Sequence, residues 1–146
     1  MEIEWEKVII ETIILAGIIF GAVYVEHWNY RRLQRNEEAT TRKKMIVLLT
    51  NNLVRKLRFI EESIQYKDYK PFFTDIWDAV VLSGKQTLLS FEIIENLQHT
   101  YSWMKYYNTE LQQKNTTDDD KILKDLLEEV RKSIDQSLKI LKENKA

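Results

Sequence analysis

The pattern of apolar and polar residues divides the chain into one unbroken apolar run followed by several amphipathic stretches. The run, Val8 to Val25, holds a single side chain that is charged at neutral pH, Glu11. It has no stripe with a 3.6-residue period, which indicates an apolar environment on every side. An α-helix rises about 1.5 Å per residue, so this length matches a bilayer core of roughly 30 Å. We therefore predict a transmembrane helix over residues 8–28, after a short tail at residues 1–7.

The residues flanking this segment favour a membrane span. The aromatic residues there are Trp5, Tyr24, Trp28 and Tyr30, and such rings prefer the headgroup zone. A cleaved secretory signal fits poorly, because the leading MEIEWEK is acidic and no small-x-small cleavage site follows. The alternative is a buried core helix of a soluble bundle.

Charge predicts the orientation. The basic residues that follow the apolar run are Arg31, Arg32, Arg35, Arg42, Lys43 and Lys44. Such residues stay in the cytoplasm, so we expect a single-pass protein of the cell membrane with its N-terminus outside and its C-terminal domain cytoplasmic. The glycosylation sequon at Asn115 should then remain unmodified. The basic segment, residues 29–44, is either a topology determinant or a site for anionic lipid headgroups, at roughly 1 kcal/mol per basic residue.

Apolar residues spaced three or four apart predict an amphipathic helix from about Met45 to Tyr66. The stripe is Ile46, Leu49, Leu53, Leu57, Ile60 and Ile64. The polar residues expected on the other faces are Arg55, Lys56, Arg58, Glu61 and Glu62. The helix can also simply continue from the membrane segment through residues 29–44.

Residues that commonly begin or end helices divide the rest of the chain into segments. Pro71 should end or prevent helix, Thr74 or Asp75 can cap a short helix, and Gly84 can stop it in the left-handed conformation. A loop through Leu88 and Leu89 should lead to the cap residue Ser90.

Two long helices are then predicted, from Ser90 to about Lys114 and over about residues 119–143. The first should bury Ile93 or Ile94, Leu97, Tyr101, Met104, Asn108 and Leu111. The second should bury the heptad-like set Leu123, Leu127, Val130, Ile134 and Leu141, widened by Leu126 and Leu138. Such stripes cannot be buried singly, so we expect an all-α protein in which residues 45–146 form a cytoplasmic antiparallel bundle of three long helices and one short helix.

The segment from Thr74 to Asn108 carries a family resemblance. Its features are Thr74, Asp75, Trp77, Ser83, Gly84, Leu88, Leu89, Leu97, Tyr101, Tyr107 and Asn108. This pattern resembles a segment of uncharacterised bacterial and archaeal single-pass membrane-anchored helical proteins. The resemblance implies an anchor followed by helices and brings no activity with it.

Residues able to carry chemistry are few. The chain has no cysteine and two histidines, which excludes disulfides and thiolate metal sites. Glu95 lies four residues from His99, whereas a di-iron bundle needs Glu-x-x-His pairs. The net charge of −1 gives no basic field for nucleic acid. We expect no catalytic, cofactor or metal site, no nucleic-acid partner and no small-molecule substrate.

Residues suited to interaction are better represented. Gly17 and Gly21 form Gly-x-x-x-Gly, which lets two membrane helices approach closely, although chance matches are frequent. Glu11 within the apolar run indicates a partner or polar path, unless it reaches the headgroups. His99, Trp103 and Tyr106 are expected off the buried stripe, as an aromatic docking patch or as a cover for the Pro71 loop.

Two functional hypotheses follow. The first is a non-enzymatic, membrane-tethered helical interaction or accessory module that contacts lipid and either a protein partner or a second copy of itself. The alternative is a sensor of anionic lipid or envelope stress that acts through the basic segment.

Overall fold

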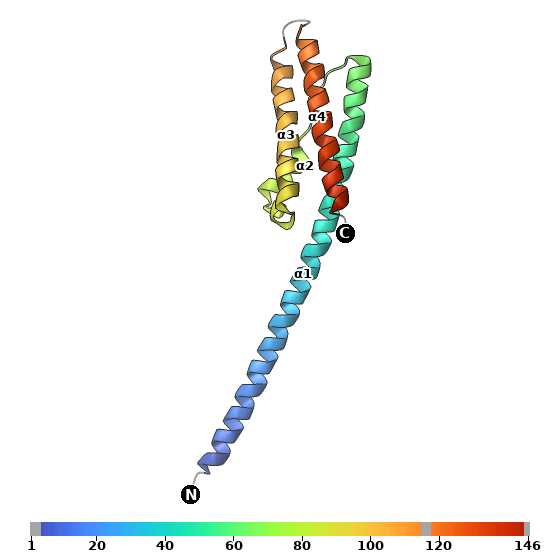
Figure 1. Ribbon diagram of the computed structural model, residues 1–146. Helices are drawn as coiled ribbons and strands as arrows, with labels where there is room; N and C mark the ends of the chain where they lie inside the picture. Colours follow the sequence, from blue (N-terminus) through green and yellow to red (C-terminus); the bar gives the residue numbers. More distant parts are fainter. Residues whose placement is uncertain (1–3, 115–117, 145–146) are drawn as a thin grey trace. The chain divides into compact units, whose positions relative to one another are not determined.

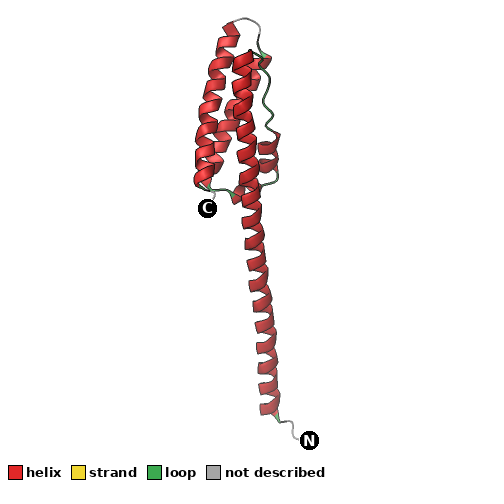
Figure 2. Cartoon of the chain, turned by 90° about the vertical axis from the view of Figure 1, so that its right-hand side faces the viewer, coloured by secondary structure: helices red, strands yellow, loops and turns green. Residues whose placement is uncertain are grey.

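The computed structural model describes residues 4–114 and 118–144, and every regular element in that part of the chain is helical (Figures 1 and 2). The α-helices are α1 (Trp5–Tyr66), α2 (Asp75–Leu82), α3 (Phe91–Gln112) and α4 (Asp118–Glu143), with a short 3₁₀-helix, η1 (Lys85–Leu88). The all-helical class is therefore confirmed. The sequon at Asn115 lies outside the described residues.

The predicted span, the basic segment and the first amphipathic helix are one helix, α1, rather than separate elements. No glycine or proline occurs between Gly21 and Pro71, so nothing interrupts the backbone hydrogen bonds in that stretch. The helix ends at Tyr66, where Lys67 takes a left-handed conformation with φ of 52°. Pro71 thus follows the helix end by several residues.

The chain divides into two compact units, residues 1–40 and 41–146. In the first unit, every described side chain from Glu4 to Thr40 is exposed. The second unit has a hydrophobic core. Its buried apolar residues are Met45, Ile46, Leu49, Leu53 and Ile60 of α1, Phe72, Trp77, Val80 and Leu89, Ile93, Leu97, Tyr101, Met104 and Tyr107 of α3, and Leu123, Leu126, Leu127, Val130, Ile134, Ile140 and Leu141 of α4.

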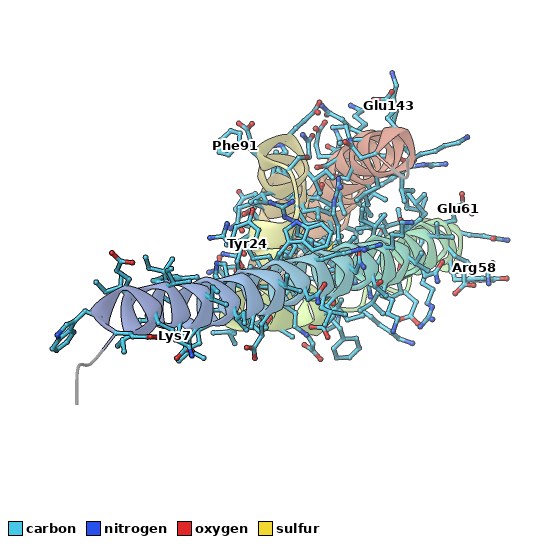
Figure 3. All side chains as sticks on the ribbon, turned by 90° about the horizontal axis from the view of Figure 1, so that it is seen from below. Lys7, Tyr24, Arg58, Glu61, Phe91 and Glu143 are labelled. Carbon is cyan, nitrogen blue, oxygen red and sulfur yellow. The ribbon has the colours of Figure 1, made fainter. Side chains whose placement is uncertain are left out.

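This core confirms most of the predicted stripes and corrects several positions. Leu57, Ile64 and Leu138 are half-buried, as are Asn108 and Leu111, while Tyr107 takes a fully buried place. Lys56, expected on an outer face, is buried at 8% exposure. In contrast, Arg58 and Glu61 point outward from α1, as predicted (Figure 3).

Gly84 and Ser90 take their predicted roles at helix ends, whereas Thr74 does not. Gly84 is left-handed, with φ of 71°, and the Ser90 hydroxyl accepts a hydrogen bond from the Ile93 amide at 3.4 Å; both predictions are confirmed. Thr74 occupies the cap position of α2 without capping it, because its hydroxyl donates instead to the Asp78 carboxylate at 2.8 Å. The stretch predicted as a loop before Ser90 forms η1.

Helices α3 and α4 lie side by side (Figure 1) and run in opposite directions, because Thr100 pairs with Ser133 while Asn96 pairs with Ser137. Thr100 Oγ1 lies 2.7 Å from Ser133 Oγ and 2.8 Å from Ser137 Oγ. All three hydroxyl side chains are buried. We call these residues the hydroxyl cluster; small side chains at these positions let the two helices approach closely.

Polar contacts also tie α1 and α2 to α3. The Tyr101 hydroxyl donates to Asn52 of α1 at 2.8 Å. The Trp77 ring of α2 stacks on Tyr101 at 5.7 Å between centroids, and its indole N–H donates to Gln98 at 3.2 Å. Burial raises the pKa of Tyr101 above its ordinary value, so its hydroxyl keeps its proton and remains a donor.

Candidate functional site

The apolar segment of α1 is long and apolar enough to cross a membrane, and none of its residues is buried in the structure. The large apolar side chains of this segment have exposed fractions from 45% at Val8 to 76% at Phe20, and side chains stand out along the helix on all sides (Figure 3). A large apolar surface without a cover on any side indicates an apolar surrounding medium or a partner.

Glu11, Gly17 and Gly21 of this segment are also exposed. A Cβ atom added at Gly17 or at Gly21 would meet no atom within 4 Å. Both positions can therefore accept larger side chains without a clash inside the described chain.

The basic residues after this segment are solvent-accessible. Arg31, Arg32, Arg35, Lys43 and Lys44 are exposed, and Arg42 is half-buried. The Arg32 guanidinium lies 5.9 Å from the centroid of the Trp28 ring, within the range of a cation–π contact. The helix itself therefore leaves most of these charges available to headgroups or solvent.

His99, Trp103 and Tyr106 form one group of side chains on α3, which we call the aromatic patch. The Trp103 indole N–H donates to His99 Nε2 at 3.0 Å, and the Trp103 ring meets the Tyr106 ring edge to face at 6.0 Å. His99 and Tyr106 are exposed and Trp103 is half-buried. The patch is thus an ordered group of side chains on the outer surface of the second unit.

The Pro71 loop is held by other residues. Asn108 of α3 accepts from the Phe72 amide at 2.7 Å and donates to the Phe72 carbonyl at 2.9 Å. The Phe72 ring packs edge to face on Phe59 and on Tyr107, with centroids 5.1 and 5.2 Å apart. Asn108 therefore holds both backbone polar groups of Phe72 instead of filling an apolar stripe.

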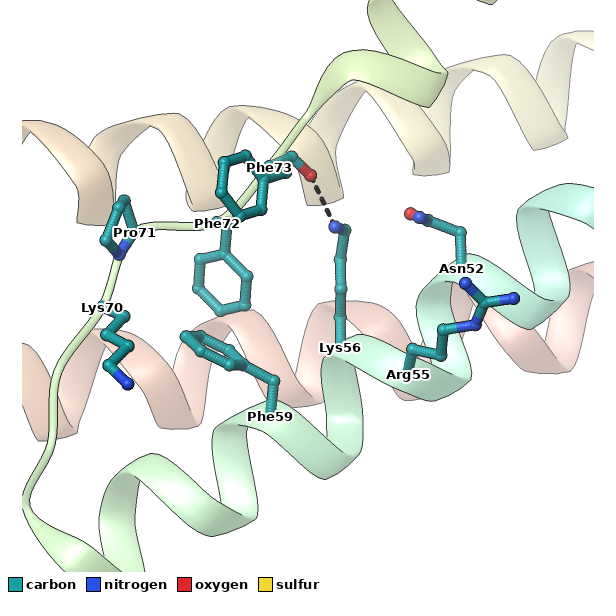
Figure 4. A pocket seen from close by; sticks show the side chains of 8 residues that line it. All are labelled: Asn52, Arg55, Lys56, Phe59, Lys70, Pro71, Phe72 and Phe73. Carbon is teal, nitrogen blue, oxygen red and sulfur yellow. Dashed lines mark hydrogen bonds between the residues drawn. The ribbon is translucent and has the colours of Figure 1, made fainter.

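A cavity of about 400 Å³ opens between this loop and α1 (Figure 4). Its lining residues are Asn52, Arg55, Lys56, Phe59, Lys70, Pro71, Phe72 and Phe73. The two halves of this lining are separated by ten residues of sequence, and no local periodicity joins them. This cavity could therefore not be predicted from local sequence patterns.

Lys56 stands in the middle of the cavity wall. Its ammonium donates to the Phe73 carbonyl, and it lies between the Phe72 ring and the Asn52 side chain (Figure 4). Burial lowers the pKa of Lys56, and the nearby Asp75 carboxylate partly opposes that shift. The ammonium is thus in a place where an additional anion would stabilise its charged form.

Among the residues that the structure describes, no group of three His, Asp or Glu side chains is placed to hold a metal ion. Comparisons of the chain with protein-family models, with curated proteins and with solved structures find no match. The described residues thus define an all-helical protein that carries one helix able to cross a membrane.

Proposed function

We propose that the chain is a membrane-tethered helical interaction module, in which α1 crosses the membrane once and residues 41–146 form an antiparallel bundle. The observation that supports this most strongly is the exposed apolar surface around the whole circumference of α1 from Val8 to Val25. Burial of apolar surface gains about 25 cal/mol per Å², and a bilayer covers such a helix on all sides.

The second unit is suited to contacts with another protein. Several large apolar side chains remain exposed outside its core, among them Val47, Leu48 and Val54 on α1. Phe91, at the start of α3, is 78% exposed and points outward (Figure 3). Together with the aromatic patch, these residues supply the aromatic and apolar groups that are enriched at protein interfaces.

Membrane extraction tests the tether. We expect the full-length chain to stay in the pellet after carbonate washing of native membranes and to keep its intact mass. Replacing Leu15 and Ile19 with arginine places two charges near the middle of the segment, at a cost of about 2.5–3.5 kcal/mol each, and should release the chain. Arginines at Val47 and Val54, which are similarly exposed but lie in the second unit, are the matched control and should leave it membrane-bound. A compact, soluble full-length monomer, or a chain shortened by a signal peptidase, would refute the tether.

Single-cysteine variants test the orientation, because the chain contains no cysteine of its own. We propose that the N-terminus is outside, on the basis of the arginines and lysines that follow the apolar segment. A membrane-impermeant maleimide should then label Glu4→Cys in intact cells and leave Gln136→Cys unlabelled until the cells are opened. The reverse pattern would overturn the proposed sidedness.

We further propose that Gly17 and Gly21 let two copies of α1 associate. Both glycines can accept a larger side chain within the described chain, so Gly17→Ile with Gly21→Ile should weaken association in a membrane two-hybrid assay without unfolding the protein. Ala16→Ile with Ala22→Ile adds similar bulk on other sides of the same helix and should have little effect. Equal association of both double variants would remove this interface.

The exposed basic residues favour a second candidate function, the recognition of anionic lipid. Chain purified from native membranes should carry anionic lipid, and the triple change of Arg31, Arg32 and Arg35 to glutamine should reduce the bound amount. Glutamines at Arg58 and Lys139 remove charge from exposed positions of the second unit outside the cavity lining and serve as the control. Equal lipid retention by all three proteins would exclude the sensor hypothesis.

A further inference from the structure

The cavity between α1 and the Pro71 loop combines an apolar wall with a basic one. Phe59, Phe72 and Phe73 provide three aromatic rings, while Arg55 and Lys56 provide the positive charge. Lys70 adds a third basic group and is itself paired with Asp68 at 3.0 Å. All eight lining residues are described, and none of them is acidic.

We infer that this cavity binds a small anionic amphiphile, whose acidic group meets Lys56 and Arg55 and whose apolar body lies against the phenylalanine rings. A volume of about 400 Å³ falls within the range of small-molecule sites, about 300–1,000 Å³. Such sites are mostly apolar with a few polar groups that fix the orientation of the ligand. This inference does not depend on the membrane tether.

The position of Lys56 favours an acidic ligand. An ammonium has three N–H donors, and within the described residues the acceptor bound to Lys56 Nζ is the Phe73 carbonyl, a neutral group. A carboxylate or phosphate can take a remaining donor in a charge-assisted hydrogen bond, which is about twice as strong as a neutral one. Burial lowers the pKa of Lys56 and the Asp75 carboxylate opposes this shift only in part, so a further anion beside the ammonium would stabilise its charged form.

Contacts with surrounding residues preorganise part of the cavity lining. Asn108 fixes the backbone of Phe72 through two hydrogen bonds, and Phe59 and Tyr107 fix its ring. Asn52 is held from the other side by the Tyr101 hydroxyl. Phe72 and Asn52 are therefore positioned before a ligand binds, which reduces the entropy lost on binding.

Photolabelling of the full-length chain in maltoside micelles tests this inference. The probe is 4-benzoylbenzoate, which has two aromatic rings, a photoreactive ketone and one carboxylate; 4-methylbenzophenone is its neutral counterpart. Tandem mass spectrometry of the digested protein locates the label. We expect the carboxylate probe to label residues 52–59 and 70–73 far more than the neutral probe does, while both label the apolar segment of α1 through the micelle.

Charge-removing variants give the decisive comparison. Lys56→Met retains an apolar stem without the charge and should lower cavity labelling by about tenfold. Arg55→Gln should lower cavity labelling as well. Because Arg55 is exposed, this change disturbs folding less than a change at the buried Lys56. Arg58→Gln changes an outward-facing arginine outside the lining (Figure 3) and should leave it unchanged. Equal labelling by the two probes, or equal losses in Arg55→Gln and Arg58→Gln, would overturn the site.

Competition identifies the source of the ligand. Decanoate represents an acid derived from membrane lipid, and 2-naphthoate represents a soluble aromatic acid. Displacement of the probe from residues 52–59 by either compound supports the shared chemistry, and the stronger competitor identifies the source. Failure of both to displace the probe would contradict the inference.

Discussion

Replacing Thr100 with valine tests how much the hydroxyl cluster contributes to stability. Thr100 is fully buried, at 0% exposure. Its Oγ1 lies 2.7 Å from Ser133 Oγ, 2.8 Å from Ser137 Oγ and 3.1 Å from the Ser133 carbonyl oxygen. Valine has nearly the same shape and no hydroxyl, so the change removes these hydrogen bonds and leaves the packing of α3 on α4 almost unaltered.

The structure also indicates the size of the effect. Ser137 keeps the Asn96 carbonyl as a partner at 3.3 Å, so the group that loses most is the Ser133 hydroxyl. A buried polar group without its partner costs about 1–3 kcal/mol. We expect Thr100→Val to lower the free energy of unfolding by about 2 kcal/mol. Ser133→Ala removes the hydroxyl that Thr100→Val leaves without a partner, and Ser137→Ala removes the third member of the cluster. The triple variant should therefore lose less stability than the sum of the three single changes.

The assay is unfolding of the full-length chain in maltoside micelles, followed by circular dichroism. The control is Ser102→Ala, because Ser102 is exposed and its hydroxyl bonds to a carbonyl of its own helix; it should change stability by less than about 0.5 kcal/mol. A Thr100→Val variant as stable as this control would refute the reasoning. Strict additivity in the triple variant would show that the three hydroxyls act independently.

Three further predictions concern the loop, the buried lysine and a turn. Asn108→Leu removes two hydrogen bonds to Phe72 and should cost about 2 kcal/mol; amide hydrogen exchange should accelerate in residues 67–74, and unchanged exchange there would contradict the role of Asn108. Burial lowers the pKa of Lys56 below its usual 10.5, although Asp75 opposes the shift, so the folded chain loses this proton before the unfolded chain does. The contribution of Lys56 to the unfolding free energy should therefore rise with pH as pH approaches 10.5, and chemical unfolding of Lys56→Met should lack that rise; identical pH profiles would disprove it. Gly84 has φ of 71° with open space around its α-carbon, so Gly84→Ala should cost about 1 kcal/mol through backbone strain alone, and a thermal midpoint equal to that of the unaltered chain would be inconsistent with this.

Local sequence signals predicted the features that depend on neighbouring residues. Gly84 and Ser90 end and begin helices as predicted, because backbone freedom and side-chain capping act within one turn. The stripe through Leu123, Leu127 and Ile134 is buried as predicted, since helical periodicity fixes which residues share a face.

Features that depend on distant residues could not be predicted in this way. Lys56 was expected on an outer face because lysine is seldom buried, yet the Phe73 carbonyl, 17 residues away, accepts its hydrogen bond. Asn108 was placed in an apolar stripe, whereas its amide matches the backbone of Phe72, 36 residues away. The hydroxyl cluster was not predicted either. Serine is usually a surface residue, and Ser133 and Ser137 are buried here because α3 packs against them.

The spacing of Ser133 and Ser137 on α4 also fixes the register in which α3 and α4 pack. A one-turn displacement of α4 in one direction would bring Leu141 to the place of Ser137, so that one oxygen facing Thr100 is lost. Displacement in the other direction would bring Glu129, now exposed, to the place of Ser133 and force a carboxylate into the interior at a cost of several kcal/mol. Thr100, Ser133 and Ser137 therefore make both shifted registers less stable than the observed one. The register that buries Glu129 is the less favourable of the two.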